Sequence, residues 1–392
     1  MTHYSIHLLK KLVKVFLLSS FLIVPSLSLE VEKDWSNSLK PCWVKNSEIN
    51  YNYLFASDNK LKISQINPVA VLVSNDLIVG INSANGNTIW KSQIAGTIIS
   101  EPKVSDNSIF ILSKPKISDK VNAIDKSEFE NETVYLTSIN IFSGLSNWKI
   151  KFPSATEIFI NTENTENTEK KELYILSEKT KLSLINTLNN EIIWTKNFAE
   201  EIMLVFPLSE KVLVSTKKNE ILIISSKDGK ILNNRKNKEL AIKYKQNNNK
   251  ANNNIFSVGE SGNIINTNLD TDKIIWQRKI GGKVSNINFY DNTLFISSFD
   301  NFVYLFNKDT GKLLLKKRLD GRIVNKVSQQ DNIIAVSAYN SLQITLFNLK
   351  TIKEVNFLSL SDADVFIEHF VFSEKFLIIA TPKNIIAFSF DC

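Results

Sequence analysis

Few side chains of this sequence are of the types that carry out acid–base, nucleophilic or metal chemistry. After the first 28 residues, which have the pattern of a secretion signal, the chain contains one histidine, His369, and two cysteines. His369 lies in the apolar segment Phe-Ile-Glu-His-Phe-Val-Phe, where a structural role is expected. A zinc site needs several Cys or His ligands at short spacing, and a serine hydrolase of the common kind needs a Gly-x-Ser-x-Gly turn. Neither pattern is present, so both kinds of site are excluded.

Glycine and aspartate patterns predict turns rather than ligand sites. Gly259-Glu-Ser-Gly262 and Gly281-Gly282 lack the surrounding sequence of a phosphate-binding loop. Asp362 and Asp364 match half of a calcium loop, but no glycine and no distal glutamate follow in register. We therefore predict no catalytic, cofactor-binding or metal-binding residue, and a protein that is not an enzyme.

The chain is instead dominated by a repeated strand–turn–strand unit, seen most clearly in residues 302–315. Side chains at 302–307 alternate with the period of two that is typical of a β-strand. Asp309-Thr-Gly311 then supplies a turn, because glycine accepts the positive φ that a hairpin needs. A second apolar strand follows the turn.

Seven copies of this unit align on an Asn or Ser that ends the first strand and on the residue eight positions later, which is often Trp. The copies run 82–90, 140–148, 186–194, 225–233, 268–276, 307–315 and 348–356, and an eighth first strand follows at 384–389. Their steps are roughly 40 residues once insertions are allowed for, which is the size of one β-propeller blade. We predict an all-β fold, an eight-bladed β-propeller of four-stranded antiparallel blades.

The eighth copy has a first strand and no second one. Residues 38–43 end in Trp43, which is followed by Val-Lys-Asn much as Trp194 is followed by Thr-Lys-Asn. We predict that this N-terminal strand pairs with the strand at 384–390 of the C-terminal blade. Such pairing closes the ring and removes exposed sheet edges.

Three regions are assigned along the chain: a signal peptide at 1–28, an N-terminal segment with the ring-closing strand at 29–50, and the propeller at 51–392. The signal has basic residues before an apolar run at 15–24 and small residues near position 28. The apolar run is short for a membrane span, which needs about 20 residues. An uncleaved anchor stays open as an alternative, and no lipobox follows the run.

Three segments depart from the repeat: the insertions at 115–133 and 161–171, and the segment 236–254. The second is a polar repeat of Asn-Thr-Glu with no apolar residue to bury, which predicts a disordered loop. The third is rich in Lys and Asn. Because loops on rigid scaffolds often carry function, the first two are the expected places for partner contacts.

The charge of the chain does not indicate nucleic-acid binding. The sequence has 47 basic and 40 acidic residues and a net charge of +7. This falls to about +4 without Lys10, Lys11 and Lys14 of the leader. Along the sequence the basic residues are mixed with acidic ones, and no basic stripe alternates with aromatic residues.

The copies resemble the pyrroloquinoline-quinone-like propeller repeat, in which an Asn or Asp ends one strand, a Gly forms the turn and a Trp ends the next strand. In that repeat the Trp ring packs between neighbouring blades. Trp90, Trp148, Trp194 and Trp276 match this docking position. Asn233, Leu315 and Asn356 depart from it, so these three blades should pack less well, because Trp buries a larger area.

An exported chain of this length with eight such blades looks most like the BamB family. That family is the propeller subunit of the machinery that inserts β-barrels into the bacterial outer membrane. The resemblance covers residues 40–392. Two features depart from the family: the lipobox is missing, and the loop by which the family contacts its barrel-protein partner has no match here. No binding residue is therefore carried over.

The two cysteines are predicted to lie close together if the ring closes as described. Cys42 precedes Trp43, and Cys392 lies three residues beyond the strand with which that segment should pair. An oxidising compartment would permit a disulfide at this closure. Two unrelated thiols are the alternative.

The resemblance implies a non-catalytic protein-interaction scaffold without a cofactor, an accessory in the assembly of outer-membrane β-barrel proteins. Its expected partner is the outer-membrane barrel-assembly protein, and it would be a monomer within a larger complex, at most peripheral to the membrane. Its expected place is the periplasm, at the inner face of the outer membrane. The alternatives are a periplasmic quinoprotein-type enzyme and a luminal propeller of a secretory pathway.

Overall fold

The computed structural model describes most of the propeller. The described residues are 41–47, 51–56, 68–105, 107–116, 133–160, 172–208, 210–236, 241–246, 254–269, 271, 273–324, 327–360 and 366–389. All of them belong to the compact unit Ser38–Cys392. The predicted signal peptide, the insertion at 161–171, most of that at 115–133, and Asp362, Asp364 and Cys392 lie outside the described residues.

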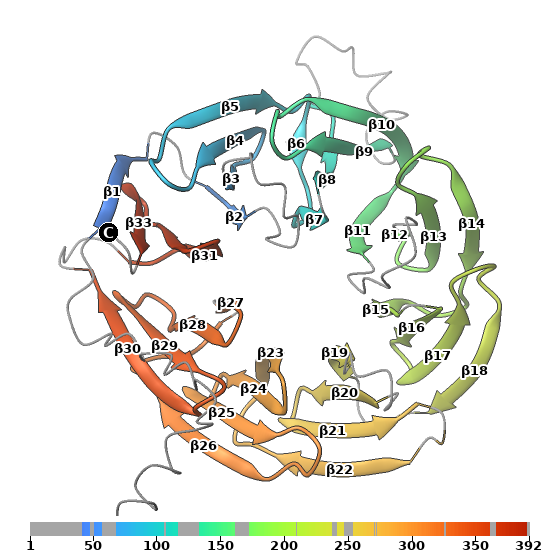
Figure 1. Cartoon of the computed structure of the whole chain (residues 1–392). Helices are drawn as coiled ribbons and strands as arrows, with labels where there is room; N and C mark the ends of the chain where they lie inside the picture. Colours follow the sequence, from blue (N-terminus) through green and yellow to red (C-terminus); the bar gives the residue numbers. More distant parts are fainter. Residues whose placement is uncertain are drawn as a thin grey trace, which may run out of the picture. The chain divides into compact units, whose positions relative to one another are not determined.

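The described residues form eight separate antiparallel sheets arranged as the blades of a ring, which confirms the predicted eight-bladed propeller (Figure 1). Each blade runs outward from an innermost strand to an outermost strand at the rim. The described part of the chain contains strands and turns and no helix. It accordingly has no helix long and apolar enough to cross a membrane.

The first four blades follow one another along the chain. Their strands are, in blade 1, β2 (Tyr53–Ala56), β3 (Val69–Val73), β4 (Leu77–Asn82) and β5 (Thr88–Gln93); in blade 2, β6 (Thr97–Ile98), β7 (Lys103–Ser105), β8 (Ser108–Lys114), β9 (Thr133–Asn140) and β10 (Ser146–Pro153); in blade 3, β11 (Ala155–Ile160), β12 (Glu172–Ser177), β13 (Lys181–Asn186) and β14 (Ile192–Asn197); and in blade 4, β15 (Ile202–Pro207), β16 (Lys211–Thr216), β17 (Glu220–Ser225) and β18 (Ile231–Lys236). In blade 2 the innermost strand is split into β6 and β7, and both pair with β8.

The last four blades complete the ring. Their strands are, in blade 5, β19 (Ala241–Gln246), β20 (Asn254–Gly259), β21 (Asn263–Asn268) and β22 (Ile274–Lys279); in blade 6, β23 (Val284–Tyr290), β24 (Thr293–Ser298), β25 (Phe302–Asn307) and β26 (Leu313–Arg318); in blade 7, β27 (Val327–Gln330), β28 (Ile333–Ser337), β29 (Gln343–Asn348) and β30 (Lys353–Ser359); and in blade 8, β31 (His369–Ser373), β32 (Phe376–Ala380), β33 (Asn384–Ser389) and β1 (Pro41–Asn46).

The ring closes as predicted, because β1 is the outermost strand of the C-terminal blade and pairs with β33. Figure 1 shows the blue β1 beside the red β33. The described strand is Pro41–Asn46, so its end is shifted from the predicted Trp43 to Asn46, and residues 38–40 lie outside the described residues. Trp43 explains the shift: it occupies the same place in its strand as Trp90 does in β5, so the strand continues past it for several residues as the other outer strands do.

The Lys- and Asn-rich segment that departs from the sequence repeat contributes a strand to blade 5. The segment 236–254 contains β19, which pairs with β20 as the innermost strand of blade 5. Within its sequence, Ala-Ile-Lys-Tyr-Lys-Gln, the four residues from Ile242 to Lys245 alternate between apolar and basic. The high Lys and Asn content around it hid this short strand.

The Asn that ends most of the third strands recurs for a local physical reason. The side-chain Oδ1 of Asn82 accepts a hydrogen bond from the backbone N–H of Ala84 at 2.8 Å. Asn307 does the same for Thr310 at 2.9 Å, and Asn348 for Thr351 at 3.0 Å. An Asn at this position closes the turn by itself, which is why the sequence repeat is visible at all.

The ring has two faces and a rim. The connection face carries the segments that join one blade to the next and the turns between second and third strands, and hydrogen bonds such as Ile202 N–H to Lys179 O at 2.7 Å hold these together. The turn face carries the turns between third and outermost strands, such as 83–87 and 308–312. The rim consists of the outermost strands β1, β5, β10, β14, β18, β22, β26 and β30 (Figure 1).

Candidate interaction surface

The predicted docking tryptophans lie at the seams between blades. Each indole Nε1–H donates to a backbone carbonyl in the next blade, at the residue that follows the Asn or Ser anchor there. The pairs are Trp90 to Ile141 at 3.0 Å, Trp148 to Thr187 at 3.1 Å, Trp194 to Ser226 at 2.8 Å and Trp276 to Lys308 at 2.8 Å. Trp43 of the ring-closing strand makes the same bond, to Ser83 O at 2.9 Å.

A turn glycine of the next blade packs against the indole at most of these seams. Gly311, with φ of 65°, faces Trp276, and a Cβ atom on it would lie 2.6 Å from the ring. Gly144 faces Trp90 in the same way, with φ of 70° and 2.4 Å. Glycine is needed twice over here, for the positive φ and for the close approach. Where the glycine is present, the Trp and this Gly form one packing unit that spans two blades.

The seam after blade 4 lacks this Trp but keeps its hydrogen bond. Asn233 stands at the Trp position of β18 and is exposed. Two residues later, on the same strand, Arg235 donates from its guanidinium to Leu269 O at 3.1 Å. Leu269 follows the anchor Asn268, so its carbonyl is the equivalent acceptor. Arg235 was not predicted from the sequence, because it lies two residues after Asn233, the residue that occupies the Trp position of the repeat.

The seam between blades 6 and 7 is packed differently. Leu315 stands at the Trp position of β26, and the turn position opposite holds Ile352 in place of Gly. Ile352 has φ of 59°, a conformation that is costly for a β-branched residue. Leu315 and Ile352 pack against the same apolar cluster. Leu315 is smaller than the Trp of other seams, and Ile352 on the neighbouring blade is correspondingly larger than the usual Gly.

This matched pair gives a testable expectation. Leu315→Trp alone is expected to destabilise the protein, because Ile352 occupies the space that the indole needs. Combined with Ile352→Gly, which also relieves about 1–2 kcal/mol of backbone strain, the same change is expected to be neutral or stabilising. Denaturant unfolding of the two single variants and the double variant should give a favourable coupling free energy of about 1–3 kcal/mol. Additive effects would show that the two positions do not share this space.

A crevice of about 210 Å³ opens at the seam between blades 6 and 7, toward the connection face. The Nζ of Lys317 lies 2.7 Å from a carboxylate oxygen of Glu354 on the neighbouring blade. The residues that line the crevice are Lys317, Arg318, Leu319, Asp320, Ala338, Ser341, Gln343, Thr345 and Glu354. The lining thus combines both charges with hydroxyl and amide groups.

Exposed apolar side chains on the connection face lie beside this crevice. Tyr339 is 61% exposed and Phe366 is 40% exposed. Their segments run side by side, because Ile367 N–H donates to Ser341 O at 3.1 Å. Met203 and Ile99 are exposed on the same face, at blades 4 and 2. Aromatic residues exposed in this way are typical of the anchor positions of protein interfaces.

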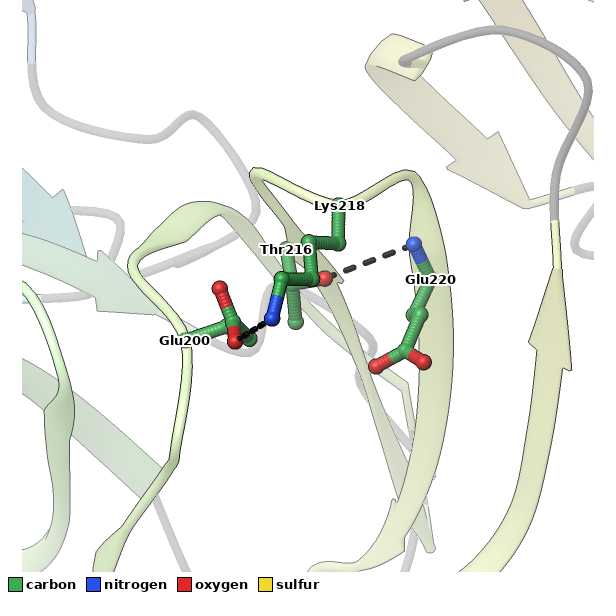
Figure 2. A network of polar contacts seen from close by, with 4 residues as sticks. All are labelled: Glu200, Thr216, Lys218 and Glu220. Carbon is green, nitrogen blue, oxygen red and sulfur yellow. Dashed lines mark hydrogen bonds and ion pairs between the residues drawn. The ribbon is translucent and has the colours of Figure 1, made fainter.

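Ion pairs surround the connection face at several blades. Figure 2 shows one at blade 4, where the ammonium of Lys218 contacts the carboxylate of Glu200 and the hydroxyl of Thr216 accepts a hydrogen bond from the N–H of Glu220 at 3.3 Å. The hydrogen bond to Glu200 raises the pKa of Lys218. Next to it, the hydrogen bond from Lys217 lowers the pKa of Glu201. Both shifts favour the charged forms of Lys218 and Glu201.

The residues considered for chemistry are scattered. His369 begins β31 and is half-buried in blade 8. Gly262, with φ of 85°, closes the turn after β20, and Gly281-Gly282 lies in the connection after β22. Among the described residues no three His, Cys, Asp or Glu side chains gather as metal ligands. Cys42 is disulfide-bonded, while Cys392 lies outside the described residues, so their pairing stays a prediction.

Comparison with known protein families identifies the family to which this chain belongs. The family model described as "Outer membrane protein assembly factor BamB" matches residues 148–290 and 260–354, which together span more than half of the sequence. The chain belongs to the BamB family. The resemblance inferred from the repeat is thereby confirmed. No curated protein sequence matches the chain significantly.

Solved structures agree with the fold. BamB from Moraxella catarrhalis superposes with a TM-score of 0.55 at 12% identity, covering 87% of this chain and 99% of that one. The computationally designed protein Ika8 superposes with a TM-score of 0.66 at 12% identity, covering 88% of this chain and 98% of that one. At such identity the likeness shows a shared fold, and the contacts of this BamB-family chain have to be argued from its own residues.

Proposed function

We propose that this BamB-family protein is a non-catalytic scaffold in the assembly of outer-membrane β-barrel proteins. The observation that carries the proposal is family membership together with a closed ring that presents apolar anchors among ion pairs on one face. In this role it is exported to the periplasm and works at the inner face of the outer membrane. It binds the outer-membrane barrel-assembly protein as one subunit of a larger complex.

The partner docks on the connection face, around Tyr339 and Phe366. These two side chains offer exposed ring surface that a partner can bury, and buried aromatic anchors supply most of the free energy at protein interfaces. The neighbouring crevice accepts polar groups of the partner, and the charged pairs at blade 4 steer its approach. The strands beneath are held in the ring by seams on both sides, so the face is preformed.

The rim offers a second kind of contact. In each blade the outermost strand has one side paired and the other at the end of its sheet. An extended segment of an unfolded barrel protein can pair with such an edge through backbone hydrogen bonds, which read no particular sequence. This suits a scaffold that handles many different β-barrel substrates.

The test is co-purification of the barrel-assembly protein from cross-linked membranes of cells that make tagged variants. Tyr339→Ser with Phe366→Ser is expected to reduce the captured partner at least tenfold, since anchor residues of this kind each contribute about 2 kcal/mol or more. Leu145→Ser with Leu188→Ser is the matched control, because both leucines are exposed on the turn face. This control should capture as much partner as the wild type.

Two results would overturn the proposal. Equal capture by both double variants would show that the connection face is not the docking surface. Absence of the barrel-assembly protein from every sample, with quinone absorbance in the purified protein, would favour the quinoprotein-type enzyme.

A further inference from the structure

The rim of the propeller is strongly basic, which the sequence does not reveal. Its eight strands contain 13 Lys and Arg residues and one acidic residue, Glu354. The whole chain has 47 basic and 40 acidic residues. Everything outside the rim therefore has 34 basic residues (47 less 13) and 39 acidic residues (40 less 1), a small acidic excess. The rim strands thus concentrate basic side chains with a single acidic one.

The charge is densest on three consecutive blades. Strands β18, β22 and β26 lie next to one another at the rim (Figure 1). They carry seven basic residues and no acidic one: Arg235, Lys236, Arg278, Lys279, Lys316, Lys317 and Arg318. We call the outward surface of these strands the blade 4–6 rim. All seven residues are exposed or half-buried.

Exposed aliphatic side chains occupy the other end of the same three strands. They are Ile231, Leu232, Ile274, Ile275 and Leu313, all at least 45% exposed. They come before the Trp position in each strand, toward the turn face, while the basic residues follow it. The blade 4–6 rim therefore has an aliphatic band beside a basic band, and both bands continue from blade to blade.

Protection of sheet edges explains only half of this arrangement. Two or three basic residues on one outer strand, as on β18, β22 and β26, disfavour its pairing with other chains and leave strand addition to the less basic rim strands. This accounts for the basic band taken alone. Exposed pairs of Ile and Leu have the opposite effect, because they favour association. A surface that retains both is suited to a partner that is anionic and also accepts aliphatic groups.

We propose that the blade 4–6 rim binds the surface of an anionic lipid bilayer. Lipid headgroups attract Lys and Arg by charge alone, without a shaped pocket. Aliphatic side chains next to such a basic cluster enter the boundary between headgroups and acyl chains. The two bands repeat along neighbouring strands and form a long contact line, which fits the plane of a membrane. Binding would set the ring edge-on, with the connection face at right angles to the bilayer.

Co-sedimentation with vesicles tests this directly. The purified protein is mixed with vesicles of phosphatidylcholine alone or of phosphatidylcholine with phosphatidylglycerol. Binding is expected only to the anionic vesicles, and high ionic strength should weaken it. The variant Lys236→Glu, Lys279→Glu, Lys316→Glu is expected to bind at least about 100-fold more weakly, because three charges are reversed at the surface.

The control variants distinguish an effect of where the reversed charges lie on the rim from an effect of the total charge of the protein. Lys91→Glu, Lys149→Glu, Lys151→Glu changes the net charge equally on rim strands of blades 1 and 2 and should bind nearly as the wild type does. Ile274→Ser with Leu313→Ser should weaken binding several-fold without altering the charge. Unfolding curves of all variants confirm that each is folded.

Several outcomes would overturn the proposal. They are equal binding to both kinds of vesicle, no binding to either, equal losses in the two triple variants, and binding of random-sequence DNA as tight as that of anionic vesicles. The last result would identify an unspecific polyanion surface.

Discussion

Replacing Trp276 with alanine is expected to lower the free energy of unfolding by about 3–5 kcal/mol. The side chain is 6% exposed and packs against Phe256 with ring centroids 5.7 Å apart. Its indole N–H donates to Lys308 O at 2.8 Å across the seam. The substitution removes this bond and opens a cavity against Gly311, whose turn backbone cannot move in to fill it. Denaturant unfolding followed by fluorescence or circular dichroism measures the loss.

Asn233→Ala is the matched control, because Asn233 occupies the same place in β18 and is exposed. It should change the stability by no more than about 0.5 kcal/mol. A loss below about 1 kcal/mol for Trp276→Ala, or similar losses for both variants, would contradict the view that tryptophans join the blades. Arg235→Ala should cost more than Asn233→Ala, since Arg235 supplies the hydrogen bond at that seam.

Replacing Cys42 with serine is expected to cost several kcal/mol, up to about 6 kcal/mol in the chain-entropy model. Cys42 is disulfide-bonded and sits at a register shift of β1, between the pairs Pro41–Phe388 and Trp43–Ala387. Cys392, close along the chain to Phe388, is the only other cysteine in the sequence. A bond between them encloses a loop of roughly 350 residues, so it limits the unfolded chain strongly.

The Cys392→Ser variant and the double variant form the control set. All three should lose the same amount of stability, because each removes the same bond. The wild type under reducing conditions should fall to their level. Additive losses, or two free thiols by intact-mass measurement after non-reducing purification, would contradict the disulfide.

The architecture could be predicted because its repeated signals are local. The anchor at Asn307 closes its own turn, Gly311 provides the positive φ, and Trp276 marks the strand whose ring meets that glycine. In a copy of the repeat that has all three, the Asn anchor, the turn glycine and the Trp position lie within nine residues, so the pattern can be recognised in a single sequence. Ring closure by β1 could be predicted for the same reason, since Trp43 is followed by Val-Lys-Asn much as Trp194 is followed by Thr-Lys-Asn.

The departures and the surfaces could not be predicted because they depend on contacts between blades. Leu315 and Ile352 compensate each other across a seam, and no spacing in the sequence relates them. Arg235 reaches the usual acceptor from a shifted position. The exposure of Tyr339 and the basic rim both depend on which way a strand faces in the closed ring. The strand β19 was lost in a Lys- and Asn-rich segment.

Cross-linking mass spectrometry with a lysine-reactive reagent, applied to intact envelopes, tests the docking claim most directly. Lys217, Lys218 and Lys283 lie on the connection face, and Lys227, Lys312 and Lys350 lie on the turn face. The account predicts cross-links from the barrel-assembly protein to the first three lysines and few to the second three. Cross-links to the turn-face lysines instead, or none to this partner while other envelope proteins are captured, would contradict it.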